Sequence, residues 1–368
     1  MDMKYLINDS LKIKPASKRG IFSSTTTPPG KIHMNYNENP YGMCPGARKA
    51  MLDIIDDCNR YQDFHAIKLK EVIADHYGIT LDHIITGSGS STMIDLVGEI
   101  FLNIGDEVVY CTPTYEAFPD MISDNGAVRV PVPLTADYKF DLDAMRAAIT
   151  DKTKLAIIVN PNNPTGTCVS GAQIEAFIRG LPDHVIPVVD EAYIEFTNSD
   201  ETYSMLKLIN EGYDRPLIVL RTFSKIYGLA GLRVGYCIAP PEIIDEMNKI
   251  DQAWNMSKLS QAAAVEAMKD QDYIKMVKEK TILNRKYLVD GLRDLGCEVA
   301  DSVTNFIYFR SPIEPKELVK IMNERYDILM SAFDDRSRVT CGLPEENKAF
   351  LSAMRGIISE TTAEKISA

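Results

Sequence analysis

Lys225 stands where a lysine can act as a nucleophile. It follows the apolar segment Leu217–Leu220, which is typical of a buried strand. A lysine at the end of such a strand is costly to keep charged, so desolvation favours its neutral, nucleophilic amine. Three other segments offer partners: Asn160–Gly166, Val188–Tyr193 and Arg233. Together these residues could hold pyridoxal phosphate, with Lys225 as its Schiff-base lysine.

Other side chains match the demands of the pyridoxal ring. Its nitrogen must stay protonated, and Asp190 follows an apolar strand, at the edge where open α/β sheets bind ligands. Asn163 and Tyr193 could donate hydrogen bonds to the phenolic oxygen, and Tyr115 could stack on the ring. Each has an ordinary alternative: Asp190 as a solvated loop acid, Tyr115 as a core aromatic residue, and the Asn-Pro segment as a turn.

A glycine- and serine-rich loop, Gly87–Ser91, is a candidate for the cofactor phosphate. It follows a predicted strand and opens a helix that we expect to begin near Thr92. A helix N-terminus presents free amide groups and a favourable dipole to an anion, although many such loops are ordinary helix starts. The candidate phosphate ligands are Ser90, Ser91, Ser224 and Arg233.

Arg338 is a candidate for recognition of the substrate. It begins the segment Arg338–Cys341, which reads as a short strand. The guanidinium fork suits bidentate binding of an α-carboxylate. As an isolated residue, this arginine would more often be a surface charge.

The composition is that of an ordinary globular protein. The chain has 368 residues, 45% of them apolar and 25% charged, and a net charge of −12 without a long basic run. Nothing here calls for a nucleic-acid partner, a membrane span or a signal peptide. The five histidines and seven cysteines show no metal-ligand spacing, so we expect no metal site and a cytoplasmic location.

The elements that must position these residues alternate between strands and helices. Such alternation predicts an α/β fold with a mostly parallel central sheet. Two of the predicted helices are 93–101 and 173–178. The candidate strands are 84–86, 107–110, 127–132, 155–159, 185–189, 217–220 and 234–238.

We divide the chain into an arm and two domains. Residues 1–31 are polar and irregular and read as an N-terminal arm, and residues 32–265 form the predicted large, cofactor-binding domain. Helical spacing over 261–295 predicts one long helix that leads into a small α+β domain, residues 266–368. The elements expected there are strands 305–309, 328–330 and 338–341 and helices 315–325 and 345–357.

The motifs described above resemble those of a known family. From about residue 34 to 354 it is similar to the class I/II aminotransferases of fold type I, and most closely to their histidinol-phosphate branch. The blocks around Asn163, Asp190, Lys225 and Arg233 match in type and spacing. Further motifs that carry the resemblance are Asn35–Gly42, Asn59–Tyr61 and Arg338–Asn347.

The resemblance implies roles beyond those argued from the residues. It implies pyridoxal phosphate as cofactor and a homodimer with shared active sites, in which Tyr61 reaches the cofactor phosphate of the neighbouring subunit. Lys225 would also shuttle the proton during transamination. Tyr36 and Asn37 would join Arg338 on the substrate side.

The chain departs from the histidinol-phosphate branch mainly on that substrate side. Where an arginine usually helps to hold the substrate phosphate, this chain has Met330 and Ser331. The arm segment 17–22 lacks the tyrosine that often reaches the substrate, and Tyr36 replaces a small residue. Ser91-Thr92 also replaces a common acidic pair. We therefore expect an α-amino acid with an uncharged, for example aromatic, side chain to be a better donor than histidinol phosphate.

Three functions remain open from the sequence. The first is an aminotransferase that moves an amino group from an amino acid or a histidinol-phosphate-like amine to a 2-oxo acid such as 2-oxoglutarate. The second is a decarboxylase, lyase or oxidase of an amino acid on the same fold, because the ring-binding residues do not decide which bond breaks. The third is a non-catalytic binding or regulatory protein, against which the complete set of lysine, aspartate and arginine argues.

Overall fold

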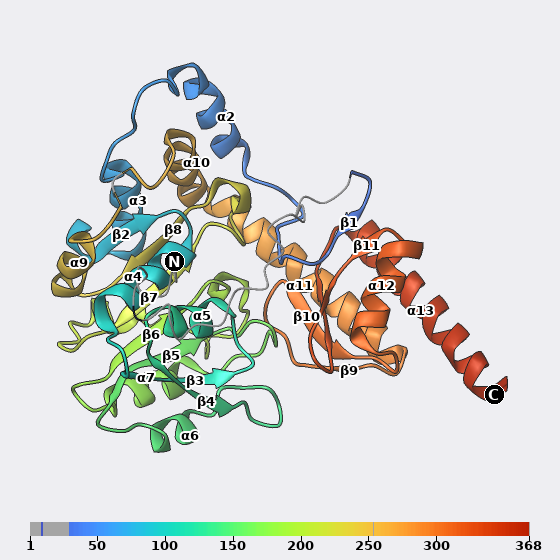
Figure 1. Cartoon of the computed structure of the whole chain (residues 1–368). Helices are drawn as coiled ribbons and strands as arrows, with labels where there is room; N and C mark the ends of the chain where they lie inside the picture. Colours follow the sequence, from blue (N-terminus) through green and yellow to red (C-terminus); the bar gives the residue numbers. More distant parts are fainter. Residues whose placement is uncertain (1–8, 10–28, 253, 368) are drawn as a thin grey trace, which may run out of the picture.

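The computed structural model describes residue 9, residues 29–252 and residues 254–367. A seven-stranded sheet forms the larger part of these residues (Figure 1). The pairs on either side of its second strand are antiparallel and all others are parallel, as predicted. In spatial order the strands are β2 (Ile84–Gly87), β8 (Gly235–Ile238), β7 (Ile218–Thr222), β6 (Ile186–Asp190), β5 (Thr153–Val159), β3 (Glu107–Thr112) and β4 (Val128–Pro133).

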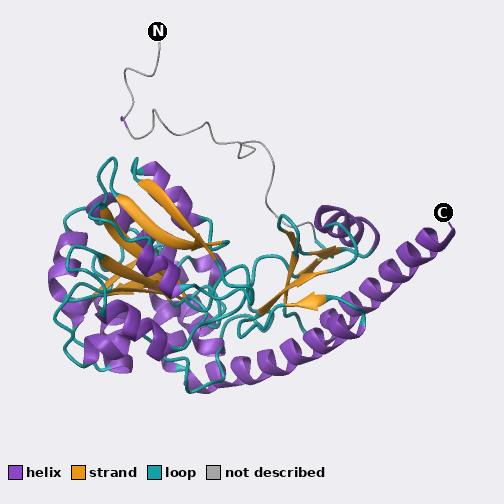
Figure 2. Cartoon of the chain, turned by 90° about the horizontal axis from the view of Figure 1, so that it is seen from below, coloured by secondary structure: helices purple, strands orange, loops and turns teal. Residues whose placement is uncertain are grey.

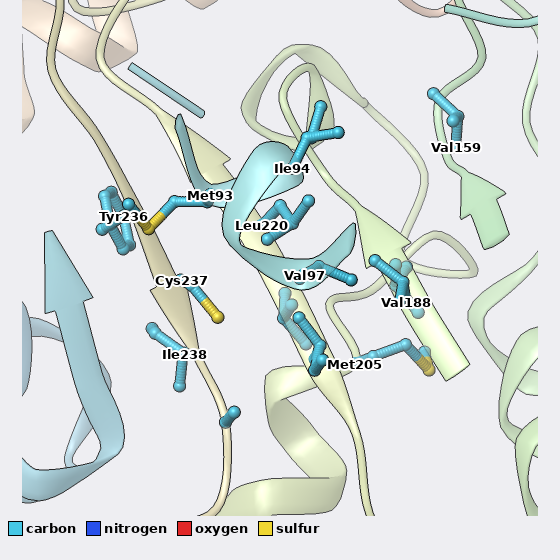
Figure 3. Packing of buried hydrophobic residues seen from close by; sticks show 14 of the residues in the cluster. Met93, Ile94, Val97, Val159, Val188, Met205, Leu220, Tyr236, Cys237 and Ile238 are labelled. Carbon is cyan, nitrogen blue, oxygen red and sulfur yellow. The ribbon is translucent and has the colours of Figure 1, made fainter. Parts of the chain in front are cut away.

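Helices cover this sheet because its central strands are apolar throughout. Every residue of β6 and β7 is buried, as expected of parallel strands covered on both faces. Figure 3 shows one covering helix, α4 (Ser90–Phe101), lying over β7 and β8. The other elements are α2 (Pro45–Ile54), α3 (Ile67–Tyr77), α5 (Ala117–Asp124), α6 (Leu142–Ala147), α7 (Gly171–Arg179), α8 (Leu206–Asn210), α9 (Pro241–Asn248) and the short turns η2 (Ile55–Asp57), η3 (Leu81–His83), η4 (Ile194–Phe196) and η5 (Ala230–Leu232).

The single long helix predicted over 261–295 is wrong, because the chain forms two helices there. α10 (Lys258–Lys269) and α11 (Gln271–Asp294) meet at Asp270, whose ψ of 69° is not helical. The Asp270 carboxylate accepts a hydrogen bond from the backbone N–H of Tyr273 at 3.0 Å and thereby caps α11. The helical spacing of apolar residues continues across Asp270, so the sequence pattern did not indicate two separate helices.

A second, smaller body follows α11 (Figure 2). A four-stranded antiparallel sheet has the order β12 (Ser331–Ala332), β13 (Ser337–Thr340), β10 (Phe306–Arg310) and β9 (Glu298–Val299). Beside it, β1 (Ile32–His33) pairs in parallel with β11 (Ile328–Leu329). Two helices complete this body: α12 (Pro315–Arg325) and α13 (Pro344–Ser367).

Each body has its own apolar core, and α11 contributes to both. Ile274 and Val277 pack in the large core, whereas Leu288 and Leu292, further along the helix, pack in the small one. Met34, which is fully buried, also packs in the small core. The domain boundaries at residues 32 and 266 stay predictions. Most of the predicted arm, residues 1–8 and 10–28, lies outside the described residues.

None of the helices in the described part of the chain is both long and apolar enough to cross a membrane. No group of three or more histidine, cysteine, aspartate or glutamate side chains there is placed to hold a metal ion.

Candidate active site

Functional side chains gather where the parallel strands end. The carboxyl ends of β2, β5, β6 and β7 lie at one edge of the large sheet, since β8 is antiparallel to both its neighbours. A cavity of about 560 Å³ opens there, with residues of the small body on its far wall. All but one of the site residues predicted from the sequence line it. They are Tyr36, Asn37, Ser90, Ser91, Tyr115, Asn163, Asp190, Tyr193, Ser224, Lys225, Arg233 and Arg338.

The Lys225 amine enters this cavity from the loop after β7. Its Nζ donates a hydrogen bond to the backbone carbonyl of Tyr36 at 3.0 Å and lies 5.6 Å from the centre of the Tyr193 ring. Burial and then the positive charge of Arg338 lower the pKa of Lys225 to about 8. At neutral pH a larger fraction of this amine is therefore neutral than in an ordinary lysine, and the neutral amine is the nucleophilic form.

The Asp190 carboxylate lies at the last residue of β6 and is 2% exposed. Oδ1 accepts a hydrogen bond from the backbone N–H of Ala192 at 3.0 Å. Burial raises the pKa of Asp190 to about 6. No lysine or arginine of the described residues forms an ion pair with it. A buried carboxylate that lines a cavity without such an ion pair is suited to bind a cationic group of a ligand.

The start of α4 forms a corner suited to an anion. Gly89 precedes the helix at a φ of 85°, which favours glycine. A Cβ on Gly89 would collide with the Arg233 guanidinium, and one on Gly235 would collide with the backbone of Ser90. Arg233 Nη1 donates a hydrogen bond to Ser224 Oγ at 3.3 Å. The start of α4 thus lies close to a guanidinium, as an anion site requires.

Arg338 projects from β13 as a buried cation, 9% exposed. Its Nη2 donates to the carbonyl of Asn35 at 2.8 Å, and its Nη1 donates to the amide oxygen of Asn163. The guanidinium carbon lies 5.4 Å from the ring centres of both Phe306 and Phe333. Burial lowers the pKa of Arg338. Within the described ranges no carboxylate forms an ion pair with it, so an anionic ligand group would relieve its desolvation.

Tyr193 lies deep in the cavity wall, with its hydroxyl held from one side. Asn37 Nδ2 donates a hydrogen bond to Tyr193 Oη at 3.0 Å, and the ring packs edge-on against Phe306. Burial raises the pKa of Tyr193 to about 12, so the phenol keeps its proton at neutral pH and can donate it in a hydrogen bond. Burial also raises the pKa of Tyr115.

Tyr61 is the one predicted site residue that does not line the cavity. Its side chain is 79% exposed and stacks on Trp254, with ring centres 4.9 Å apart. Phe64 packs edge-on against the same tryptophan. The three rings form an exposed aromatic cluster.

Several lining residues were missed from the sequence: Glu38, Thr114, Glu116 and Phe333. The first lies inside the motif Asn35–Gly42, and that position was its available signal. Phe333 follows β12 and reaches the cavity through tertiary folding, so no local pattern marks it.

The position that departs from the histidinol-phosphate branch is occupied by a short side chain. Ser331 lines the cavity, and its Oγ donates a hydrogen bond to the carbonyl of Asn35 at 3.0 Å. Tyr36 lines the same cavity with 53% of its side chain exposed. The departing arm segment, 17–22, lies outside the described residues.

Comparison with known proteins places this site in context. The model of the family described as aminotransferase class I and II matches residues 29–354. The chain is 38% identical over 325 residues to an aromatic amino acid aminotransferase of Rhodococcus jostii, covering 88% of this chain and 89% of that protein. It is 35% identical over 334 residues to a histidinol-phosphate aminotransferase of Moorella thermoacetica, covering 89% and 86%.

A solved structure is also similar over most of its length. It is a histidinol-phosphate aminotransferase from Sinorhizobium meliloti in complex with pyridoxal-5'-phosphate. It superposes with a TM-score of 0.85 at 27% identity and covers 90% of this chain and 91% of that one.

Proposed function

The chain belongs to the class I and II aminotransferases, which use pyridoxal phosphate to exchange an amino group between an amino donor and a 2-oxo acid. From this premise we propose that the donor is an α-amino acid with an aromatic side chain. We further propose that the cavity lined by Lys225, Asp190 and Arg338 is the active site. The observation that carries the proposal is the buried Arg338, whose guanidinium forms no ion pair with a described carboxylate and can therefore bind the carboxylate of a substrate.

The residues present fit the cofactor. The bound cofactor would act as an electron sink while a bond at the substrate α-carbon is broken. Asp190, buried and without a described cation partner, would keep the ring nitrogen protonated. The first turn of α4, with Ser90, Ser91, Ser224 and Arg233, would bind the phosphate.

The remaining cavity residues would serve attachment, orientation and proton transfer. Lys225 would attach the cofactor and, once released, hold and return the substrate proton, for which a pKa of about 8 is suited. Asn163 and Tyr193 would donate hydrogen bonds to the phenolic oxygen, and Tyr115 would stack on the ring. We also propose that Tyr36 and Asn37 lie on the side of the cavity that receives the substrate.

Two features support an aromatic donor over histidinol phosphate. Ser331 offers a hydroxyl where a phosphate-binding arginine is usual in the related branch, and that hydroxyl is bonded to Asn35. The exposed ring of Tyr36 and the Phe333 ring give the cavity apolar surface. Losing a charge-assisted contact to phosphate costs about 1.5–3 kcal/mol, which is roughly 10- to 150-fold in affinity.

The test compares kcat/KM for phenylalanine, tyrosine, tryptophan and histidinol phosphate, with 2-oxoglutarate as acceptor. We expect the aromatic amino acids to exceed histidinol phosphate. Ser331→Arg should raise kcat/KM for histidinol phosphate by about 10-fold or more, whereas the matched Ser331→Ala should not. Histidinol phosphate turning over better than every amino acid would contradict the proposed substrate class and leave the aminotransferase reaction intact.

We also propose a cytoplasmic homodimer in which Tyr61 completes the partner's site. Tyr61 lies away from its own cavity, within an exposed apolar patch, and such patches mark protein interfaces. The net charge of −12 argues against a nucleic-acid partner. The patch is the aromatic cluster of Tyr61, Phe64 and Trp254.

A further inference from the structure

The side-chain amide of Asn37 forms hydrogen bonds within the protein through both its nitrogen and its oxygen. It is 2% exposed, and its Nδ2 donates a hydrogen bond to Tyr193 Oη at 3.0 Å. Its Oδ1 accepts from Thr340 Oγ1 at 3.3 Å, and its backbone N–H donates to the same Thr340 oxygen at 3.0 Å. This threonine belongs to β13, so Asn37 connects the small sheet to Tyr193.

These contacts fix which way each hydrogen points. The Thr340 hydroxyl accepts the backbone N–H of Asn37 and donates its own hydrogen to Asn37 Oδ1. The Nδ2 group that faces Tyr193 can only donate. Tyr193 Oη therefore accepts here, and the hydrogen of its hydroxyl must point elsewhere. Tyr193 lines the cavity, which is where that hydrogen has room.

The backbone of Asn37 is held as firmly as its side chain. Its carbonyl accepts a hydrogen bond from Asn305 Nδ2 at 3.0 Å. Its φ is 55°, a left-handed conformation that asparagine, aspartate and glycine tolerate better than other residues. The amide is thus presented to Tyr193 from a fixed position.

We propose that Asn37 is a positioning residue, which turns the Tyr193 hydroxyl into the cavity so that it can donate to the phenolic oxygen of the bound cofactor. The inference rests on the proposed role of Tyr193 in that site. This task is separate from the substrate-side role proposed for Asn37, because it acts through Tyr193.

Asn37→Asp tests the direction of the hydrogen bond, since it keeps size and backbone preference while replacing the donor by an acceptor. Tyr193 would then donate to the new carboxylate and no longer to the cofactor. The readout is the pH midpoint of the visible absorbance change of the holoenzyme without substrate. Losing a donor to the phenolic oxyanion disfavours the deprotonated form, so we expect the midpoint to rise by about one to two pH units.

The same change in the Tyr193→Phe background separates direction from added charge. Tyr193→Phe alone should raise the midpoint, and most of the Asn37→Asp shift should vanish in that background. Equal Asn37→Asp shifts in both backgrounds, or none, would overturn the role of Asn37. If Tyr193→Phe leaves the midpoint unchanged, the proposed role of Tyr193 fails, and that of Asn37 fails with it.

Asn37→Gly is the second variant, because glycine accepts the positive φ and adds no charge. It should raise the midpoint by less than Asn37→Asp in the native background and leave it unchanged beside Tyr193→Phe. Circular dichroism and melting temperature check that each variant is folded. An equal Asn37→Gly shift in both backgrounds would show that the amide acts by another route and overturn the proposal.

Discussion

At the scale of single residues, the cavity brings together three ionisable groups that form no close ion pair with any other described residue. Asp190 and Arg338 are both buried in the cavity wall, and Lys225 has a carbonyl as its hydrogen-bond acceptor. Burial raises the pKa of Asp190 to about 6 and lowers that of Lys225 to about 8. A site with these properties is electrostatically incomplete until a ligand supplies a cation near Asp190 and an anion near Arg338.

The first prediction concerns Lys225. Borohydride reduction of the holoenzyme followed by digestion and mass spectrometry should place the cofactor on Lys225, the lysine that the cavity contains. Lys225→Ala should abolish amino transfer in a single turnover. A reduced adduct on a different lysine would refute the assignment.

The second prediction is that Asp190→Asn has opposite effects on activity and on stability. Turnover should fall by about 100-fold or more, because the carboxylate is a preorganised electrostatic group. The cofactor-free protein should instead become more stable at pH 8. The folded-state pKa of about 6 lies above the usual 3.8, so ionising Asp190 costs stability as pH rises through this range, and the cost is complete above pH 6.

Melting temperatures of the cofactor-free proteins at pH 4 and pH 8 check the second half. The advantage of Asp190→Asn should be clear at pH 8 and disappear near pH 4. Glu116→Gln is the control, since this carboxylate lines the same cavity but is exposed. A variant less stable than the native chain at pH 8 would show that the ionised carboxylate stabilises the fold.

At the scale of elements, the sequence predicted what local chemistry determines. The central strands β5, β6 and β7 are largely apolar, and polar residues after them, such as Asn163 and Lys225, were predicted to hold one cofactor. Two-residue strands such as β1 and β9 are too short for a periodic signal. Phe333 reaches the cavity by tertiary packing, which no local pattern encodes.

The break between α10 and α11 is a second feature that the sequence pattern did not predict. Apolar periodicity predicts helix on both sides but does not register a single capping residue. We expect Asp270→Ala to lower the free energy of unfolding by about 0.5–2 kcal/mol, because the Tyr273 N–H loses its acceptor. Urea denaturation measures this, with Asp272→Ala, in the first turn of the same helix, as control. Equal effects of both substitutions would argue against a specific cap.

At the scale of the whole molecule, the cavity exists because two bodies meet. Asp190 comes from the large sheet and Arg338 from the small one, so their separation depends on how the bodies pack. The proposed dimer would extend this principle to a second chain.

The dimer prediction can be tested by complementation. Sedimentation should show a dimer, and mixed Lys225→Ala and Tyr61→Phe chains should regain activity, because each hybrid would hold one site with both native residues. Lys225→Ala mixed with Asp190→Asn should not recover, since both residues line the cavity of one chain. Rescue in both mixtures, or a fully active monomer, would contradict shared sites.

The pairing of β1 with β11 has a consequence for how the protein is made. Ile32 pairs with Ile328, and Met34 packs in the core of the C-terminal body. At typical synthesis rates of about 5–20 residues per second, the partner strand leaves the ribosome roughly 15 to 60 s after the first. The segment around Met34 therefore lacks its partner strand through most of translation. This segment therefore gains its native contacts only when the last strands of the chain arrive.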